Sequence, residues 1–455
     1  MKRFALGLVF LALGSARTAV AADPAPGAAP PAPLSAAPLT LEEAVATALS
    51  QNPLLRAADA GVGAAEAQVD EARSYRLPRT QLSEFASRST NPVLVFSDLL
   101  SQERFGPANF DPAFLNEPPP TNNWNTKLAV MQPIWTGGKI AGGVAAAEMG
   151  AAAAVADRDS ARQQVSEKVI EAYSGAVLAE SYRRVAGEAL ETARAHVKLV
   201  RDMVETGMVV RSDLLQAEVK ELEAKDMLIR AESQAAVARA GLNMAMGRPL
   251  GTPTTLPETV DIPTLTEHDL DALTTEAIEA RPDLKAAAAR AGAAEKMVQV
   301  AKAGYYPEIG VGGAYEANAE DFIGADGTNW TVMGTISWDI LGGFTTRPRV
   351  RRAAEQQRQA TEYAEHLKQR AGLEVHQAYY ELKASRESLA EAAKAIESAR
   401  ASLVIVEDRY KEGLTMLVEL LAGQTALNAA RTREVSARRD LLLADARLKL
   451  AIGRL

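Results

Sequence analysis

The sequence predicts a mainly helical protein with a small β part, built as two tandem repeats. Three observations lead to this fold class. Aromatic residues make up only 5% of the chain and alanine is abundant, which favours closely packed helices. Long heptad patterns recur in both halves and predict antiparallel coiled-coil helices. Four segments alternate between apolar and polar residues and end near tryptophans, which predicts four transmembrane β-strands per protomer.

The N-terminus has the pattern of a secretory signal peptide over residues 1–22. Lys2 and Arg3 precede the apolar stretch Phe4–Leu13, and Ala19-Val20-Ala21 is a small-x-small cleavage site. Residues 23–40 form a Pro/Ala-rich linker. No later stretch approaches the ~20 apolar residues of a membrane helix, so we expect an exported chain without a helical anchor. An uncleaved N-terminal anchor is the less favoured alternative.

Composition excludes several function classes. The net charge is -8 and no basic block stands out, so nucleic acid is not an expected partner. Without any cysteine, the chain has no disulfide, thiolate metal site, cysteine nucleophile or lipid anchor. The four histidines lack metal-ligand spacing, and no phosphate-binding glycine loop or G-x-S-x-G motif occurs. We therefore predict no catalytic, cofactor-binding or metal-binding residue, and no enzyme.

One structural unit is written twice along the chain. Ala48–Leu55 aligns with Ala277–Leu284, and Leu242–Arg248 aligns with Leu448–Arg454. We predict a first repeat at 41–248 and a second at 268–455. The linker between them, 249–267, contains four prolines and is expected near the middle of a helical tube.

Each repeat is expected to contain a first helix, a strand pair, a very long helix, a turn and a return helix. The expected first helices are 41–75 and 270–304, and the long helices are 140–205 and 347–411. A helix of that length spans on the order of 100 Å. We expect the return helix 212–246 to stack end to end on 270–304, and the last helix of the chain on 41–75.

A heptad seam runs along both long helices, with apolar residues at alternating steps of four and three. In the first it consists of Val165, Val169, Ala172, Ala176, Ala179, Ala186, Leu190, Ala193, Val197, Val200 and Val204, interrupted by Arg183. The second repeats it from Ala371 to Tyr410. Such seams predict coiled-coil packing, and a soluble antiparallel coiled coil accounts for them equally well.

The strands are expected at about 79–88, 123–135, 308–317 and 329–341, with an extracellular loop at about 87–123 that is rich in proline. Each strand has an apolar and a polar face, as in a membrane barrel. Four tryptophans lie near the strand ends and are expected at the membrane interfaces: Trp124, Trp135, Trp330 and Trp338.

Four strands cannot close a barrel, because eight is the usual minimum in outer membranes. An open sheet in lipid would leave the hydrogen-bonding groups of its edges unsatisfied. Two protomers would give a barrel too narrow for a channel, whereas three give twelve strands and a lumen. We therefore expect a trimeric 12-stranded β-barrel on an α-helical barrel. A pair of ordinary soluble hairpins is the alternative.

Four groups of residues carry a family resemblance. They are Leu41–Ala48 with Asn52-Pro53, Gln132–Gly138, Gly207 with Ser212–Glu218, and Ser337–Gly343. In this order the sequence resembles the TolC-like outer-membrane efflux protein (outer membrane factor) family. The resemblance implies a homotrimer in the outer membrane of a Gram-negative bacterium, with a large periplasmic part. It also implies two partners, a periplasmic adaptor (membrane fusion) protein and an inner-membrane pump of the resistance-nodulation-division or ABC type.

The implied function is a passive exit duct in a tripartite efflux or type I secretion system. The turns between long and return helices would then form the periplasmic tip that meets the adaptor. The candidate docking residues are Gly207, Met208, Ser212, Gly413, Leu414 and Thr415. The two glycines also have a plain structural explanation, since a residue leaving a helix with positive φ is commonly glycine.

Acidic residues after the turns are candidates for the periplasmic aperture. Family members often carry two acidic residues three apart, and here Glu419 matches the first position while Ala422 departs at the second. Asp213 is the equivalent of Glu419 in the first repeat, with helix N-capping or a dipole contact as its structural alternative. A periplasmic coiled-coil adaptor, or a structural protein without a channel, is the alternative function.

Overall fold

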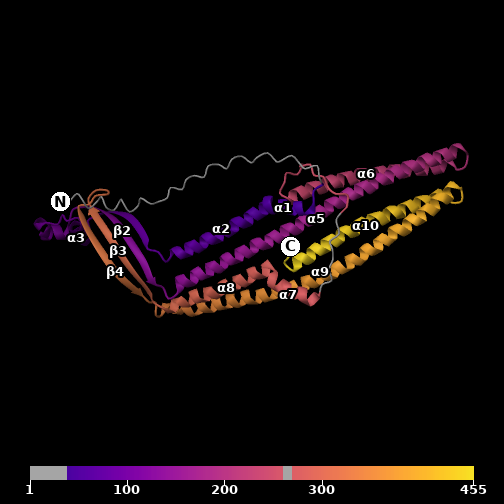
Figure 1. Cartoon of the computed structure of the whole chain (residues 1–455). Helices are drawn as coiled ribbons and strands as arrows, with labels where there is room; N and C mark the ends of the chain where they lie inside the picture. Colours follow the sequence, from indigo (N-terminus) through magenta and orange to yellow (C-terminus); the bar gives the residue numbers. More distant parts are fainter. Residues whose placement is uncertain (1–37, 260–268) are drawn as a thin grey trace. The chain divides into compact units, whose positions relative to one another are not determined.

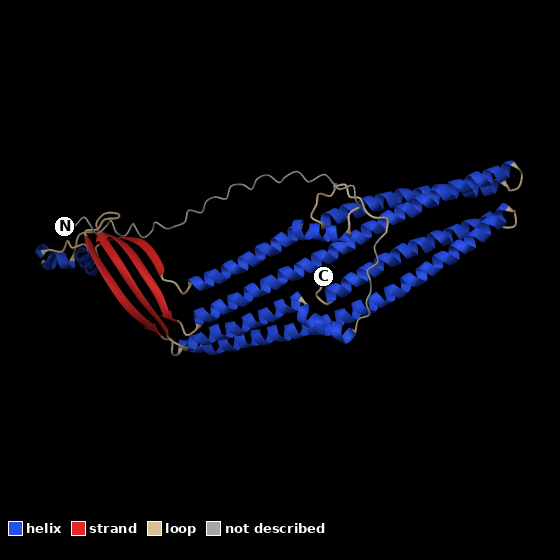
Figure 2. Ribbon diagram, viewed as in Figure 1, coloured by secondary structure: helices blue, strands red, loops and turns tan. Residues whose placement is uncertain are grey.

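The computed structural model describes residues 38–259 and 269–455. The predicted signal peptide, nearly all of the predicted linker 23–40, and residues 260–267 of the predicted linker 249–267 lie outside the described residues. Residues Leu39–Leu455 form one compact unit. Within that unit a four-stranded sheet adjoins one end of a helical layer, and the turns between long and return helices lie at the other end (Figures 1 and 2).

The first repeat contains α1 (Leu41–Gln51), α2 (Pro53–Ser74), β1 (Arg79–Ser89), α3 (Pro92–Ser101), η1 (Pro107–Phe110), α4 (Pro112–Asn116), β2 (Thr121–Trp135), α5 (Lys139–Glu205) and α6 (Arg211–Ala245). The second contains α7 (Leu270–Ala280), α8 (Pro282–Lys302), η2 (Ala303–Tyr305), β3 (Glu308–Ala319), β4 (Gly327–Ser337), η3 (Gly342–Phe344), α9 (Thr346–Lys411) and α10 (Leu417–Ala451). The mainly helical fold with four strands and two repeats is confirmed.

The heptad seams form the core of the helical layer. Val165, Val169, Leu190 and Val200 of α5 are buried, as their spacing predicts. On α9 the equivalent seam buries Val375, among others. Both long helices begin within one residue of the predicted positions and end at the predicted residue. The heptad pattern therefore predicted both ends of each long helix to within one residue.

The predicted first helices are each broken in two, which the sequence analysis missed. Asn52 separates α1 from α2, and its side chain accepts a hydrogen bond from the backbone N–H of Leu54 at 2.9 Å. Pro53 follows as the first residue of α2, where its missing N–H costs no hydrogen bond. Arg281 and Pro282 make the same break between α7 and α8. Asn-Pro is thus a helix start inside the predicted helix.

The expected end-to-end stacking between repeats is wrong, because each return helix stacks within its own repeat. The amide of Asn52 donates to Ala245 O at the end of α6 (2.9 Å), so α6 continues the line of α2. Arg281 likewise donates to Ala451 O at the end of α10 (3.3 Å), so α10 meets α8. The sequence shows helix lengths but not which ends meet.

The helices keep the order of the strands to which they are joined. The sheet order is β1-β2-β3-β4, all antiparallel. In the half nearer the sheet the helices pack side by side in the same order, α2, α5, α8 and α9. The order is kept because α2 and α8 lead into β1 and β3, and α5 and α9 follow β2 and β4. In the other half the order is α6, α5, α10 and α9. The layer therefore has two edges, one at α2 and α6 and one at α9.

One described helix, α5, is long and apolar enough to cross a membrane, by length and composition alone. The expectation that no stretch after the signal peptide approaches the apolar length of a membrane helix is therefore wrong. The same composition also suits a closely packed layer, because alanine lets helices approach one another. α5 packs against α2, α6, α8 and α10, which is the role of a central helix in this layer.

Candidate functional site

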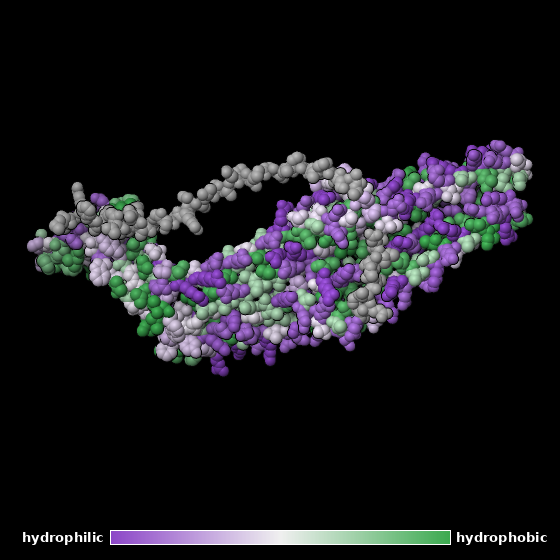
Figure 3. Space-filling view, in the orientation of Figure 1, coloured by the Kyte–Doolittle hydropathy of each residue, from purple (hydrophilic) through white to green (hydrophobic). Residues whose placement is uncertain are grey.

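The sheet has one apolar and one polar face, as the alternation predicts. Strand register places Leu82, Leu128, Tyr315 and Trp330 in one row across the four strands. Val130, Gly313 and Val332 form part of the next row on the same face. Trp330, Val332 and Ile336 have 68–76% of their surface exposed, so no described residue covers that face of β4. Figure 3 shows apolar residues gathered over the sheet.

The opposite face is polar. Ser83, Lys127, Glu316 and Asn329 form one row across the strands. Lys127 Nζ lies 2.8 Å from a carboxylate oxygen of Glu316. An apolar outside and a polar inside are the two faces of an outer-membrane barrel wall. In such a wall, the polar face is the one that would line a pore.

Each of the four predicted interface tryptophans lies toward an end of its own strand or just beyond it. Trp124 packs edge-on against Phe322 (ring centroids 5.2 Å apart), and Trp330 lies in the row of Leu128 and Tyr315, which crosses β2 four residues from Trp124. At the end nearer the helices, the Trp135 ring lies 6.0 Å from Tyr306. Trp338 Nε1 donates to Tyr305 O at 3.2 Å. These contacts group the aromatic rings at both sheet ends.

The fourth strand differs from its predicted range 329–341. β4 runs from Gly327 to Ser337, so Trp338 and Ile340 lie beyond the strand. A short turn, η3, follows and leads into α9. The apolar alternation continued past the last backbone pair, Glu308 with Ser337, because β3 begins there and offers no further partner. Sequence alternation alone could not show where the neighbouring strand begins.

The two tip turns have nearly the same backbone conformation and the same backbone hydrogen bonds. Gly207 has φ of 74° and Gly413 has φ of 73°, the left-handed conformation expected after a helix. Met208 N donates to Met203 O (2.9 Å), and Leu414 N donates to Arg409 O (2.8 Å). A Cβ added at either glycine would meet no described atom within 4 Å. Glycine is therefore required at both positions by the positive φ, and not by a lack of room for a side chain.

The apex side chains are available to a partner. Met208 and Leu414 are both more than half exposed. Ser212 Oγ lies 3.5 Å from Asp213 Oδ1, and Thr415 donates a hydrogen bond to the Glu419 carboxylate. These contacts lie within each turn and leave both apices uncovered by the described chain.

Asp213 and Glu419 occupy equivalent places, the third residue of α6 and of α10. Val210 and Met416 are the N-cap residues, and neither makes a side-chain cap bond. Asp213 is therefore not an N-cap. Its charge lies in the first helical turn, where the helix dipole favours an anion.

Buried polar groups lie between the two hairpins near the tip, and the sequence analysis did not single them out. His196 of α5 and Tyr410 of α9 are buried around a cavity of about 400 Å³ that Glu407 also lines. His196 Nε2 and Tyr410 OH have no hydrogen-bond partner among the described residues. Burial lowers the pKa of His196, partly opposed by Glu407, and burial together with Asp213 raises the pKa of Tyr410. Burial of His196 could have been predicted from its position next to the seam residue Val197.

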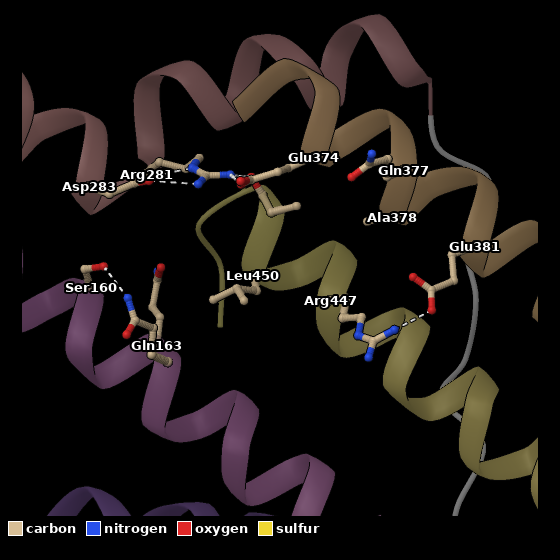
Figure 4. A pocket seen from close by; sticks show the side chains of 12 residues that line it. Ser160, Gln163, Arg281, Asp283, Glu374, Gln377, Ala378, Glu381, Arg447 and Leu450 are labelled. Atoms are coloured by element: carbon tan, nitrogen blue, oxygen red, sulfur yellow. Dashed lines mark hydrogen bonds and ion pairs between the residues drawn. The ribbon is translucent and has the colours of Figure 1, made fainter. Parts of the chain in front are cut away.

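A second polar cavity, of about 290 Å³, lies at the break between α7 and α8. There Arg281 pairs with Asp283 (2.8 Å) and Glu374 (2.7 Å), as Figure 4 shows. Burial favours a neutral Asp283, but hydrogen bonds from Arg281 and the backbone outweigh it and hold the pKa of Asp283 below its usual range. Arg370 also pairs with Glu374 (2.9 Å), so two cations face two carboxylates, and the cluster joins α8 to α9. Across the described residues, no group of three or more histidines and carboxylates could hold a metal ion, and His268 lies outside them.

Comparison with known proteins decides the family. The model of the family "Outer membrane efflux protein" matches residues 44–248 and 273–454. This chain belongs to that family. The two matched segments correspond to the two repeats read from the sequence.

Two curated relatives of this outer membrane efflux protein span much of its length. Protein CyaE of Bordetella pertussis is 28% identical over 398 residues, covering 86% of this chain and 79% of the relative. Fusaric acid resistance protein FusA of Burkholderia cepacia is 26% identical over 306 residues, covering 64% of this chain and 56% of the relative.

Solved structures share the fold at low sequence identity. The outer-membrane channel OprN matches with a TM-score of 0.76 at 21% identity, covering 91% of this chain and 89% of that one. The Campylobacter jejuni CmeC outer membrane channel matches with a TM-score of 0.77 at 19% identity, covering 91% and 85%. The chain is an outer-membrane efflux channel component with a large periplasmic helical part, and it is not an enzyme.

Proposed function

We propose that three copies of this chain close a twelve-stranded barrel and a helical tunnel, and that this trimer is the passive exit duct for cargo driven by an inner-membrane pump. The observation that carries the proposal is the pair of open sheet edges. Among the described residues, β1 and β4 each have a strand on one side only. In lipid, those free backbone groups would each cost several kcal/mol if unpaired. Pairing of β4 with β1 of a second copy satisfies both edges.

The helical layer supports the same closure. Leu215, Val219, Leu222 and Ile229 of α6 recur at steps of four, three and seven, and each is more than half exposed. A heptad-spaced apolar stripe in water needs a partner helix. The other edge of the layer, α9, carries exposed Leu373, Tyr380 and Ile405. Packing of α6 against α9 of the next copy buries both stripes.

The periplasmic tip is the proposed docking surface for the adaptor protein. Gly207 and Gly413 place the exposed Met208 and Leu414 at the two apices, beside Ser212 and Thr415. Glu419 and Asp213, in the first turns of the return helices, are the proposed aperture carboxylates. Three copies of each would attract cations in a narrow pore. Through the adaptor, the duct would serve a pump of the resistance-nodulation-division or ABC type.

Reconstitution tests the duct directly. Protein extracted from outer membranes with mild detergent should produce discrete ion-conductance steps in planar bilayers. Glu419→Gln should reduce the cation preference, because it removes one carboxylate per copy; Glu223→Gln, farther along α6, is the control. A molecule that fractionates with soluble periplasmic proteins and gives no conductance would contradict the proposal.

Docking needs a separate measurement. Met208→Asp with Leu414→Asp should abolish export in cells while the trimer and its bilayer conductance persist, since the change is confined to the apices. Normal export by this double variant would remove the apices from the docking surface.

A further inference from the structure

The connection between β1 and β2 is folded and fixed to the sheet, not the irregular loop expected from its prolines. Pro92, Pro107 and Pro112 each begin a short helix, and Asn91 caps α3 by accepting from Val93 N and Leu94 N. Val95 and Leu99 of α3 are buried. We call residues Pro92–Arg104 the outer lip, because they lie at the end of the sheet away from the helical layer (Figures 1 and 2).

The outer lip rests on the pore-facing side of the sheet. Gln102, which is 1% exposed, donates from Nε2 to Asn122 O (2.8 Å) and to Asn123 Oδ1 (2.9 Å). Asn123 in turn donates to Asn318 Oδ1 (3.2 Å). Asn123 lies four residues from Lys127 on β2, and Asn318 lies two residues from Glu316 on β3, so strand register places all four side chains on the same face. That face is the polar one.

Two further contacts hold the outer lip against β3 and β4. Arg104 pairs with Glu320, which follows β3, at 2.7 Å, and also donates to Gln102 Oε1 at 3.1 Å. Gly327, at the start of β4, lies so close to the chain that an added Cβ would overlap the carbonyl oxygen of Ser101. The outer lip therefore contacts the ends of three strands through buried hydrogen bonds and backbone packing. Buried and fully paired polar groups of this kind hold one arrangement.

We propose that the outer lip narrows the outer mouth of the channel and so limits the size of what passes, with Gln102 as the residue that positions it. The inference rests on the proposed duct, because the polar face is a pore wall only in a closed barrel. Three copies would place three lips around the inner rim. Cargo leaving the barrel would pass between them, and release of the lips would widen the exit.

Cysteine labelling on intact cells tests the lip, and the absence of native cysteine makes one introduced thiol the only target. The reporter is Thr331→Cys, on the polar face of β4 and four residues beyond Gly327 from the outer end. A small sulfonated maleimide and a bulky polyethylene glycol maleimide are added outside the cells. In the parent, the small reagent should react and the bulky one should react slowly.

Variants then release the lip. Gln102→Ala removes its hydrogen bonds, and Gly327→Ala displaces Ser101; either should raise the bulky reagent's rate roughly tenfold, equivalent to about 1.4 kcal/mol in lip opening. The small reagent's rate should stay the same. Gly334→Ala is the matched control, because a Cβ there meets no described atom within 4 Å and lies on the other face.

The outcomes separate the two proposals. Equal labelling by both reagents in the parent, or unchanged bulky labelling in both release variants, overturns the outer lip and leaves the duct standing. Failure of the small reagent to reach Thr331→Cys in any variant, with the protein present in the outer membrane, overturns the pore assignment and the lip together.

Discussion

The two return helices have the same length and equivalent positions in their repeats, yet they differ sharply in burial. α6 and α10 each contain 35 residues; four are buried in α6 and twelve in α10. The difference follows from their neighbours, because α10 lies between α5 and α9, whereas α6 packs along α5 alone. A duplicated unit thus acquires a closed side and an open side. The open side is where we expect a second copy.

The largest expected effect comes from charging the open edge. Leu222→Glu with Ile229→Glu should abolish assembly, because it places charges in the stripe that the proposed α9 contact buries. Size-exclusion chromatography with light scattering in detergent measures the assembly state. Arg230→Glu, on the same helix and pointing to solvent, is the control. A double variant that remains assembled would show that this edge is not an interface.

The next largest effect is expected where each return helix meets a helix break. Gly247 and Gly453 both have φ of 78°, and an added Cβ would lie 2.8 Å from Gln51 O and 3.0 Å from Arg281 N respectively. Alanine at either position should cost about 2–4 kcal/mol, combining backbone strain with overlap. Alanine at Gly207 or Gly413 should cost only about 1 kcal/mol, since space is open there. Thermal denaturation of the four single variants compares them, and equal losses would contradict the stacking.

A smaller effect should distinguish the two breaks themselves. Arg281→Met leaves Asp283 without its cation and Glu374 with Arg370 alone, and we expect a loss of about 1–3 kcal/mol, reduced by the partial exposure of both carboxylates. Asn52→Ala removes one amide donor and a helix cap and should cost about 1 kcal/mol. Chemical denaturation measures both, and the reverse order would contradict the charge-balance account of Figure 4.

The smallest effect concerns pH at the tip. Burial lowers the pKa of His196 in the folded chain below its unfolded value of about 6.5. The protonated imidazole is therefore disfavoured in the folded state. Stability is therefore full above that pH and should fall as the pH drops below it. The charge of Glu407 on α9 favours the protonated imidazole and so reduces this loss of stability. The other ionisable groups around the cavity are Glu191, Tyr410 and Lys411.

His196→Gln should remove this part of the pH dependence. Thermal denaturation between neutral and mildly acidic pH compares it with the parent. His376→Gln, on the part of α9 nearer the middle of the chain's helical layer, is the control. An unchanged profile in His196→Gln would exclude this residue as the source.

The sequence allowed the long helices, the repeats and the sheet faces to be predicted closely. Heptad spacing and period-two alternation report directly on burial, so α5, α9 and the row through Leu128 and Tyr315 follow from local pattern. The alternation also placed Trp124 and Trp330 within strands, each three residues from the first residue of its strand, but their position at a membrane interface stays a prediction. Helix ends were clear at Glu205 and Lys411, where Gly207 and Gly413 follow, but the breaks before Pro53 and Pro282 were not predicted.

Other features depended on partners distant in sequence. End-to-end stacking of α6 on α2 requires the pairing of Asn52 with Ala245, which no local pattern shows. Helices α3 and α4 were not predicted although Asn91-Pro92 and Asp111-Pro112 are helix-start signals, because proline was interpreted only as a helix breaker. Gln102 has no local signal at all, since its partners lie on β2. Roles of Glu419, Asp213 and the tip turns stay predictions.

Native mass spectrometry of the protein extracted from outer membranes in detergent tests the central claim most directly. Closure of both open edges predicts a single species of three mature chains, stable until the detergent micelle is removed. A monomer or a dimer as the main intact species would contradict the duct.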